Sequence, residues 1–240
     1  MKTAIMVDGG FYRKVGLPKL VKKNETPEES AQELISYCKR HLTQYKAKSH
    51  DEESVYSELY RIFYYDCPPL EKQIYHPLHK RSYNFAKTAW NKWMKRFLNE
   101  LTKQRKVALR LGNLSDNDFN YNLKYESTKK LLNGTLTIED LTDDDFTLSV
   151  VQKGVDMKIG VDIASLSYKK QVDQIVLIAG DSDFVPASKM ARREGIDFIL
   201  DSLGNPIKQD LFIHIDGLNY KDNRLMSKFN KKERTDKSQK

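Results

Sequence analysis

The second half of the chain alternates helix-like segments with short apolar runs, and this alternation constrains the fold more than any other sequence feature. Val155–Tyr168 has a helical pattern, and the apolar run Gln174–Ala179 predicts a buried strand. Phe184–Glu194 predicts a helix that ends at Gly195, and Ile196–Leu200 predicts the next strand. Strands joined through helices form a mostly parallel sheet covered on both faces. We therefore expect an α/β fold.

The first half adds elements to this sheet. Strands are expected in this half at Lys2–Val7, Leu59–Tyr65 and Val107–Leu111, and a further strand of the second half at Leu211–Ile215. Helices are expected at Glu28–Tyr45 and Tyr83–Lys103. We expect a single domain over residues 1–220, with an irregular insertion at about 112–147 between the sequence halves.

The composition supports a folded chain. Of 240 residues, 39% are hydrophobic and they include 13 Tyr and 10 Phe, which is enough buriable surface to exclude a largely disordered protein. We find neither a membrane-length apolar run nor a signal-peptide pattern, so we expect a soluble, cytoplasmic protein without membrane contact. Cys38 and Cys67 lie far apart, which favours reduced thiols over a disulfide or a zinc site.

Positive charge is concentrated at the C-terminus. Lys and Arg number 41 against 33 Asp and Glu, a balance of +8. Residues 221–240 hold eight basic and three acidic side chains, which is +5 of that excess. This tail is either a flexible arm attracted to nucleic-acid phosphates or a terminus kept soluble by its charge.

Aspartates follow several of the expected strands or begin the expected helices. They are Asp8, Asp66, Asp156, Asp181, Asp183 and Asp201. Ligands of an open parallel sheet gather at the carboxyl ends of its strands. Carboxylates that converge there repel one another unless a cation neutralises them, and oxygen ligands select Mg²⁺ or Mn²⁺. The alternative is that individual aspartates only cap turns and helices.

The segment Gly180-Asp-Ser-Asp-Phe184 is compatible with two chemistries. Haloacid-dehalogenase phosphatases also hold Mg²⁺ with a late Gly-Asp-Ser segment, but they need a second Asp two residues after the first-strand Asp. Position 10 is Gly, so this reading lacks its general acid. It remains a weak alternative.

The sequence is similar to the NYN domain family, the LabA-like branch of the PIN-like nucleases. The similarity is carried by Ile5-Met-Val-Asp8-Gly-Gly10, Tyr64-Tyr-Asp66-Cys-Pro-Pro69, Gln152-Lys-Gly-Val-Asp156 and Val176-Leu-Ile-Ala-Gly-Asp181-Ser-Asp183-Phe-Val-Pro186. It implies a Rossmann-like three-layer α/β/α sandwich whose acidic cluster binds Mg²⁺ or Mn²⁺ and cleaves RNA.

The resemblance also implies residue roles. Asp8, Asp156 and Asp181 match the metal ligands, and Asp183 matches a further acidic position. Asp162 matches as well, but it lies about 240° around the helix from Asp156, which favours a role in the fold. Many members carry an Asn shortly after the first Asp-Gly, where this chain has Gly10-Phe11-Tyr12, a departure that puts activity in question.

Substrate contacts are expected from side chains beside the aspartates. The candidates are Lys153, Tyr12, Arg13 and Ser182, together with Phe11, which has core packing as its rival role. The basic side chains of the helix expected at 83–103 form either an RNA track or a solvated face. The acidic run 139–145 is interpreted as a solvated face, and His76 with His79 as incidental.

These observations favour a metal-dependent ribonuclease that acts on single-stranded or unpaired RNA, with Asp66, Asp162 and Asp201 as secondary candidates for its site. The alternative is a catalytically weak RNA-binding or adaptor module with the same fold. A homo-oligomer or a protein partner is compatible with either hypothesis.

Overall fold

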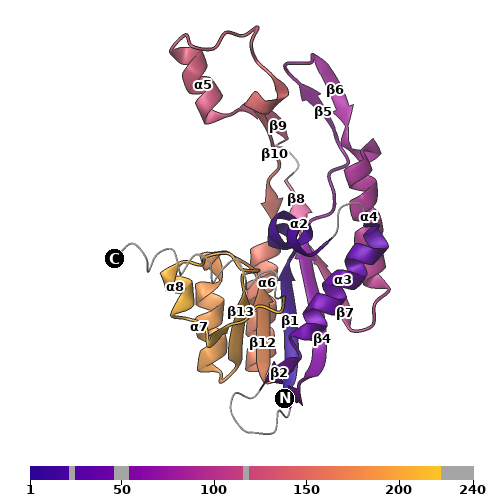
Figure 1. The fold of residues 1–240 in the computed structure, drawn as a ribbon, viewed down its shortest axis with the longest axis vertical. Helices are drawn as coiled ribbons and strands as arrows, with labels where there is room; N and C mark the ends of the chain where they lie inside the picture. Colours follow the sequence, from indigo (N-terminus) through magenta and orange to yellow (C-terminus); the bar gives the residue numbers. More distant parts are fainter. Residues whose placement is uncertain (22–24, 46–53, 116–118, 223–240) are drawn as a thin grey trace. The chain divides into compact units, whose positions relative to one another are not determined.

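The computed structural model describes residues 1–21, 25–45, 54–115 and 119–222. Its chain divides into two compact units (Figure 1). We call the first, formed by Met1–Asp66, Arg96–Leu111 and the chain from Gly154 onward, the sheet unit. The second, the hairpin unit, is formed by Cys67–Lys95 and Gly112–Lys153, so it contains the expected insertion and an earlier segment as well.

A six-stranded sheet forms the centre of the sheet unit. Its strand order is β14-β13-β12-β1-β4-β7, and every neighbouring pair is parallel. The strands are β1 (Lys2–Asp8), β4 (Glu58–Asp66), β7 (Val107–Leu111), β12 (Gln174–Ile178), β13 (Asp197–Asp201) and β14 (Gly217–Leu218). Each of β1 and β12 contains a run of five fully or almost fully buried residues, as expected for strands covered on both faces.

The contacts of two adjacent tyrosines of β4 show that helices cover both faces of the sheet. The Tyr65 hydroxyl donates to Asp162 of helix α6 (Val155–Tyr168), at 2.9 Å. The Tyr64 ring packs edge-on against Phe97 of helix α4, with centroids 5.7 Å apart. Because successive side chains of a strand point to opposite faces, α6 and α4 cover opposite faces. The α/β/α sandwich with a parallel sheet is thus confirmed.

The remaining helices of the sheet unit include several that the sequence patterns missed. They are α1 (Gly9–Phe11), a π-helical turn (Tyr12–Gly16), α2 (Leu17–Leu20), α3 (Pro27–Arg40), α7 (Val185–Arg193) and α8 (Gln209–Phe212). The strand expected at Leu211–Ile215 is wrong, because α8 occupies its first half. The end of the helix expected to reach Tyr45 is also wrong, because β2 (Thr43–Tyr45) pairs there with β3 (Ser54–Tyr56).

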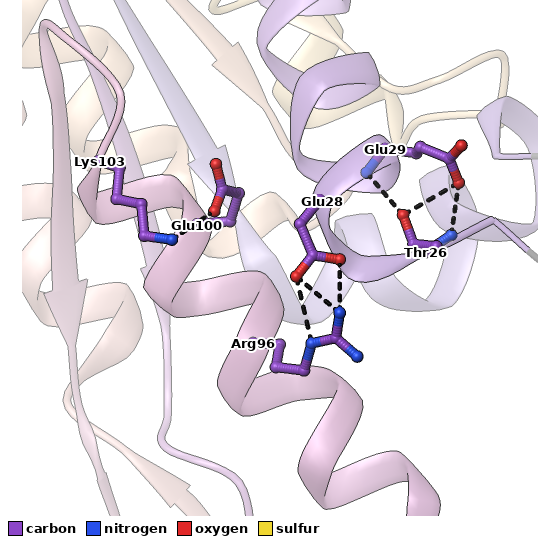
Figure 2. Close-up of polar contacts among 6 residues, drawn as sticks. All are labelled: Thr26, Glu28, Glu29, Arg96, Glu100 and Lys103. Carbon is purple, nitrogen blue, oxygen red and sulfur yellow. Dashed lines mark hydrogen bonds and ion pairs between the residues drawn. The ribbon is translucent and has the colours of Figure 1, made fainter.

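Helices α3 and α4 (Ala89–Thr102) are joined by an ion pair at their surface (Figure 2). Arg96 of α4 holds both carboxylate oxygens of Glu28, at 2.9–3.1 Å. At the start of α3, the N-cap residue Thr26 and Glu29 of the first turn form a reciprocal capping box. Each side chain accepts a hydrogen bond from the backbone amide of the other residue. Lys103 also pairs with Glu100, and Lys95 with Glu71. Part of the basic surface expected to track RNA is therefore neutralised within the protein.

The hairpin unit is built from short antiparallel pairs. Its elements are β5 (Gln73–His76), β6 (Arg81–Asn84), a 3₁₀ turn (Phe85–Lys87), β8 (Asn113–Leu114), β9 (Asn120–Leu123), α5 (Tyr125–Leu132), a 3₁₀ turn (Asp143–Asp145), β10 (Phe146–Ser149) and β11 (Gln152–Lys153). Strand β5 pairs with β6, β9 with β10, and β8 with β11. The helix expected to start at Tyr83 is therefore wrong over its first six residues.

Two further sequence expectations concern membrane contact and the basic C-terminal tail. In the described part of the chain, no helix is long and apolar enough to cross a membrane. Most of the basic tail lies outside the described residues. Of its described part, Lys221 donates to the Thr43 carbonyl at 2.9 Å.

Candidate functional site

Asp8 stands where β1 ends and the first helical turn begins. Its Oδ1 accepts the Phe11 amide at 3.0 Å, so the carboxylate caps the turn as well as facing the carboxyl end of the sheet. The pKa of Asp8 is raised to about 6, mainly by burial; the Phe11 amide lowers it, and the charges of Asp156 and Asp66 contribute to the rise. The structure therefore brings three of the predicted aspartates into electrostatic contact.

A glycine permits this close approach of β1 and β4. A Cβ on Gly9 would lie 2.5 Å from the Tyr65 carbonyl and 2.7 Å from Asp66 Oδ2, so no other residue fits without displacing backbone. Asp66 is fully buried, and Arg13 neutralises it with two parallel hydrogen bonds of 2.9 Å. The Tyr64 hydroxyl donates to the same carboxylate at 3.2 Å. Asp66 and Arg13 thus form a rigid pair beside Asp8.

The other half of the site comes from α6 and from the loop after β12. Asp156 lies in the first turn of α6, just after Gly154, whose φ of 81° only glycine adopts readily. Partial burial raises the pKa of Asp156, and the charges of Asp181 and Asp183 raise it further. Asp181 caps a 3₁₀ turn (Ser182–Phe184) by accepting the Asp183 amide at 3.2 Å. Both loop aspartates are exposed to solvent.

Phe11 connects the two halves by packing. A Cβ on Gly180 would lie 2.4 Å from the Phe11 ring, so this ring lies directly against the backbone that leads into Asp181. Of the two roles considered for Phe11, packing is the one that this contact supports.

One cation of the site was missed in the sequence. Lys208 Nζ donates to Ser182 Oγ at 3.1 Å, which places an exposed ammonium group beside the aspartate loop. Lys208 lies seven positions after Asp201 in the loop that follows β13. The rule that ligands gather at strand ends could have found it, because β13 neighbours β12 in the sheet.

The structure places other predicted site residues in structural roles. Tyr12 is fully buried, which does not fit the predicted contact with substrate, and it packs against Tyr64 with centroids 6.5 Å apart. Arg13 is committed to Asp66 rather than free for a phosphate. Asp162 binds Tyr65 and Arg110, each at 2.9 Å, and so joins α6 to β4 and β7.

Asp201 and Lys153 have other contacts within their own units. Asp201 is fully buried, accepts the Leu203 amide at 2.7 Å and the His41 ring at 2.9 Å, and is bonded by the Tyr37 hydroxyl. These hydrogen bonds of Asp201 connect the C-terminal end of α3 to β13. Lys153 belongs to the hairpin unit, where it is exposed and pairs with Asn113 in the β8–β11 ladder.

The site aspartates are close but not in contact as ligands of one ion. Within the described residues, no three of their carboxylates have oxygens that all lie within 4.8 Å of one another. A different group, His76, His79 and Asp143, does meet this distance in the hairpin unit.

Comparison with known sequences identifies the family. The sequence profile of the NYN domain matches residues 75–214, more than half of the chain. The chain belongs to the NYN domain family. The NYN domain has a PIN-like nuclease fold, and proteins of this family are generally nucleases, so the predicted family is confirmed. The matched range contains Asp156, Asp181 and Asp183 but begins after Asp8.

Other comparisons add little to this assignment. A crystal structure of a protein of unknown function from Vibrio parahaemolyticus aligns over 93% of this chain and 94% of that chain. The two share 14% sequence identity and a TM-score of 0.42. Among curated proteins, no sequence matches significantly.

Proposed function

We propose that this NYN domain protein is a divalent-metal-dependent ribonuclease that hydrolyses phosphodiester bonds of single-stranded or unpaired RNA. The observation that carries the proposal is the electrostatic coupling of aspartates from separate elements. Asp8 ends β1, Asp156 begins α6 and Asp181 follows β12, and the coupling links Asp8 to Asp156 and Asp156 to Asp181. A protein gains nothing in stability from such repulsion, so a ligand of opposite charge is its natural explanation.

The donor set fits Mg²⁺ or Mn²⁺. Asp8, Asp156, Asp181 and Asp183 offer only carboxylate oxygens, which hard divalent cations prefer. Burial raises the pKa of Asp8 and of Asp156 most, and neighbouring carboxylates raise it further, as expected of acidic groups gathered at one place. When bound, such an ion would polarise the scissile phosphate and lower the pKa of water.

The remaining residues fit the handling of a phosphodiester. An ionised Asp181 or Asp183 at the exposed rim can accept a proton from an attacking water. Lys208, held by Ser182, places positive charge where negative charge develops on phosphate oxygens. We retain Lys153 as a candidate phosphate ligand, because it precedes Gly154 directly in the chain. Membership of the LabA-like branch belongs to the same proposal.

One observation favours the alternative of an RNA-binding module without turnover. The resemblance to NYN domains implies an Asn near this position in many members, where this chain has Phe11, whose ring lies against Gly180. If that amide orients the substrate or the water in active members, this chain binds RNA and cleaves it slowly. The phosphatase alternative has no comparable support, since Gly10 supplies no general acid.

The deciding experiment incubates end-labelled single-stranded RNA with wild type, Asp181→Asn and Asp156→Asn in Mn²⁺, Mg²⁺ or EDTA. Asp144→Asn is the matched control, because Asp144 is an exposed aspartate of the hairpin unit. We expect metal-dependent fragments from wild type and from the control, and at least a hundredfold less from both site variants, roughly the loss on removing one transition-state contact. RNA binding without cleavage in any metal would establish the alternative. Turnover of p-nitrophenyl phosphate that Asp8→Asn abolishes would revive the phosphatase.

A further inference from the structure

A second, chemically different cluster lies in the hairpin unit. His76 ends strand β5, and His79 lies in the four-residue turn that leads to β6. The third member, Asp143, opens the 3₁₀ turn before β10. One ligand atom from each of the three residues lies within 4.8 Å of the other two. We propose that these three side chains bind a transition-metal ion of the Zn²⁺ class, which cross-links the β5–β6 turn to the segment before β10.

The distances suit one ion shared by three ligands. Asp143 Oδ1 lies 2.8 Å from His79 Nε2 and 3.8 Å from His76 Nε2. Two ligands held about 2.0–2.1 Å from a tetrahedral Zn²⁺ lie about 3.3 Å apart, a value between the two observed distances. The three atoms therefore need only small side-chain movements to surround an ion, and one coordination position is left for water.

His76 is built into the unit rather than displayed on its surface. It is 4% exposed, and its ring packs against Tyr121 and Phe146, with centroids 4.0 and 5.3 Å away. The His79 ring stacks on it at 4.4 Å. This packing holds both imidazoles side by side with an Nε2 of each near the same carboxylate oxygen, which is the arrangement that a metal site requires.

The hydrogen bonding of His76 points to a ligand. Its Nδ1 is buried and has no hydrogen-bond partner within the described structure, and its Nε2 is too far from Asp143 for a hydrogen bond. Coordination through Nε2 would give this ring a strong polar interaction, while Nδ1 would remain without a partner among the described residues.

His79 has the outer partner typical of a metal-binding histidine. Its Nδ1 bonds the Tyr83 hydroxyl, which also accepts a hydrogen bond from Arg81 Nε at 2.9 Å. A ligating imidazole usually donates its second N–H to such an acceptor, and this fixes both the tautomer and the ring orientation. Tyr83 therefore acts as a positioning residue for His79.

The small apolar core of the hairpin unit is a further argument for a metal cross-link. Its buried apolar side chains, among the residues described, are Cys67, Ile74 and Met94. Two-stranded pairs with so small a core are marginal by themselves, and small natural units often add a metal or disulfides. The mixed nitrogen and oxygen ligands select Zn²⁺ and its neighbours over Mg²⁺, unlike the all-oxygen aspartates of the sheet unit.

The test titrates chelator-treated full-length protein with ZnCl₂ by calorimetry and with CoCl₂ by visible absorption, which reports tetrahedral coordination. We expect one tight equivalent of Zn²⁺ in wild type and in Asp181→Asn, which removes one ligand of the separate aspartate group. His79→Ala and Asp143→Ala should lose this tight Zn²⁺ binding. Both side chains are exposed enough to be replaced without unfolding the protein. Tyr83→Phe should weaken binding by about 10- to 100-fold.

Two controls separate this site from generic metal binding. Asp144→Asn removes the neighbouring carboxylate, and His214→Gln removes a histidine of the sheet unit that pairs with Asp210. Both should bind Zn²⁺ as wild type does. The proposal is overturned if no tight equivalent binds, if His79→Ala and Asp143→Ala retain it, or if Asp181→Asn abolishes it.

Discussion

At the scale of single residues, Asp8 couples the proposed function to stability. In the folded protein its pKa is raised to about 6 from an ordinary 3.8, mainly by burial. Between about pH 4 and pH 6 the folded state therefore keeps a proton that the unfolded state has lost, so stability falls as pH rises through this window. Above it, the ionised carboxylate destabilises the fold by about 3 kcal/mol.

Asp8→Asn should remove this destabilisation and keep the Oδ1 that caps the first turn. In metal-free buffer we expect the variant to be more stable than wild type by about 3 kcal/mol at neutral pH, and nearly equal to it below about pH 4. Urea denaturation at both pH values measures the difference. A variant that is less stable than wild type at neutral pH would show that Asp8 is a structural cap rather than a destabilising ligand.

Gly180 permits the contact between the two halves of the site. Gly180→Ala places a methyl group 2.4 Å from the Phe11 ring, so we expect a loss of about 1–3 kcal/mol from overpacking. Gly160→Ala is the matched control, because nothing lies within 4 Å of its Cβ and it stands inside α6. The free energy of unfolding of Gly160→Ala should rise by about 0.5–1 kcal/mol. Thermal unfolding of the two variants measures the difference. Equal effects of Gly180→Ala and Gly160→Ala would contradict the packing role of Phe11.

The sequence could identify the main carboxylates but not the direction of every side chain. Asp8, Asp156 and Asp181 were predicted together because parallel strands and their helices all meet at one edge of the sheet, and the structure couples Asp8 to Asp156 and Asp156 to Asp181. Their role as metal ligands stays a prediction. Tyr12 and Asp201 stand at the same edge, yet they point into the core, and strand patterns do not record this. The group around Asp143 depends on a contact between residues more than sixty positions apart, which no local spacing reveals.

At the scale of elements, α3 shows which of its two surface features stabilises the helix. Thr26→Ala removes the capping box and should cost about 1 kcal/mol. Glu28→Gln removes the ion pair with Arg96, whose side chains are 42% and 63% exposed, and should produce no measurable change. Urea denaturation of both variants checks this order. A larger loss for Glu28→Gln would mean that the ion pair, not the cap, holds α3 in place.

Most elements that the sequence predicted closely are buried. Strands β1, β4, β12 and β13 and helix α6 agree with the prediction nearly to the residue, because apolar runs and helical stripes record burial directly. Strand β7 also agrees, although none of its residues is fully buried. The run Leu211–Ile215 is too short to distinguish a strand from a helix, and its first two residues belong to α8. The pattern from Tyr83 predicts a helix because aromatic residues at helical spacing continue from the hairpin into α4.

At the scale of the whole molecule, the two units differ in what holds them together. The sheet unit has a continuous apolar core across β1, β4 and β12, whereas the hairpin unit has three buried apolar side chains among its described residues. Local opening should therefore be frequent in the hairpin unit and rare in the central strands. In metal-free protein we expect backbone amides of β1 and β12 to exchange most slowly, and those of β5, β6, β9 and β10 much faster.

Each metal should then protect its own unit. Zn²⁺ binding to His76, His79 and Asp143 lowers the free energy of the closed hairpin unit, so exchange should slow in residues 73–84 and 143–149. Mn²⁺ should slow exchange in the loops that carry Asp8 and Asp181 and leave the hairpin unit unchanged. Hydrogen exchange followed by mass spectrometry, with His79→Ala and Asp181→Asn as controls, measures both effects. If either metal protected both units equally, or protected the variant that lacks its ligand, the assignment of two separate metal sites would fail.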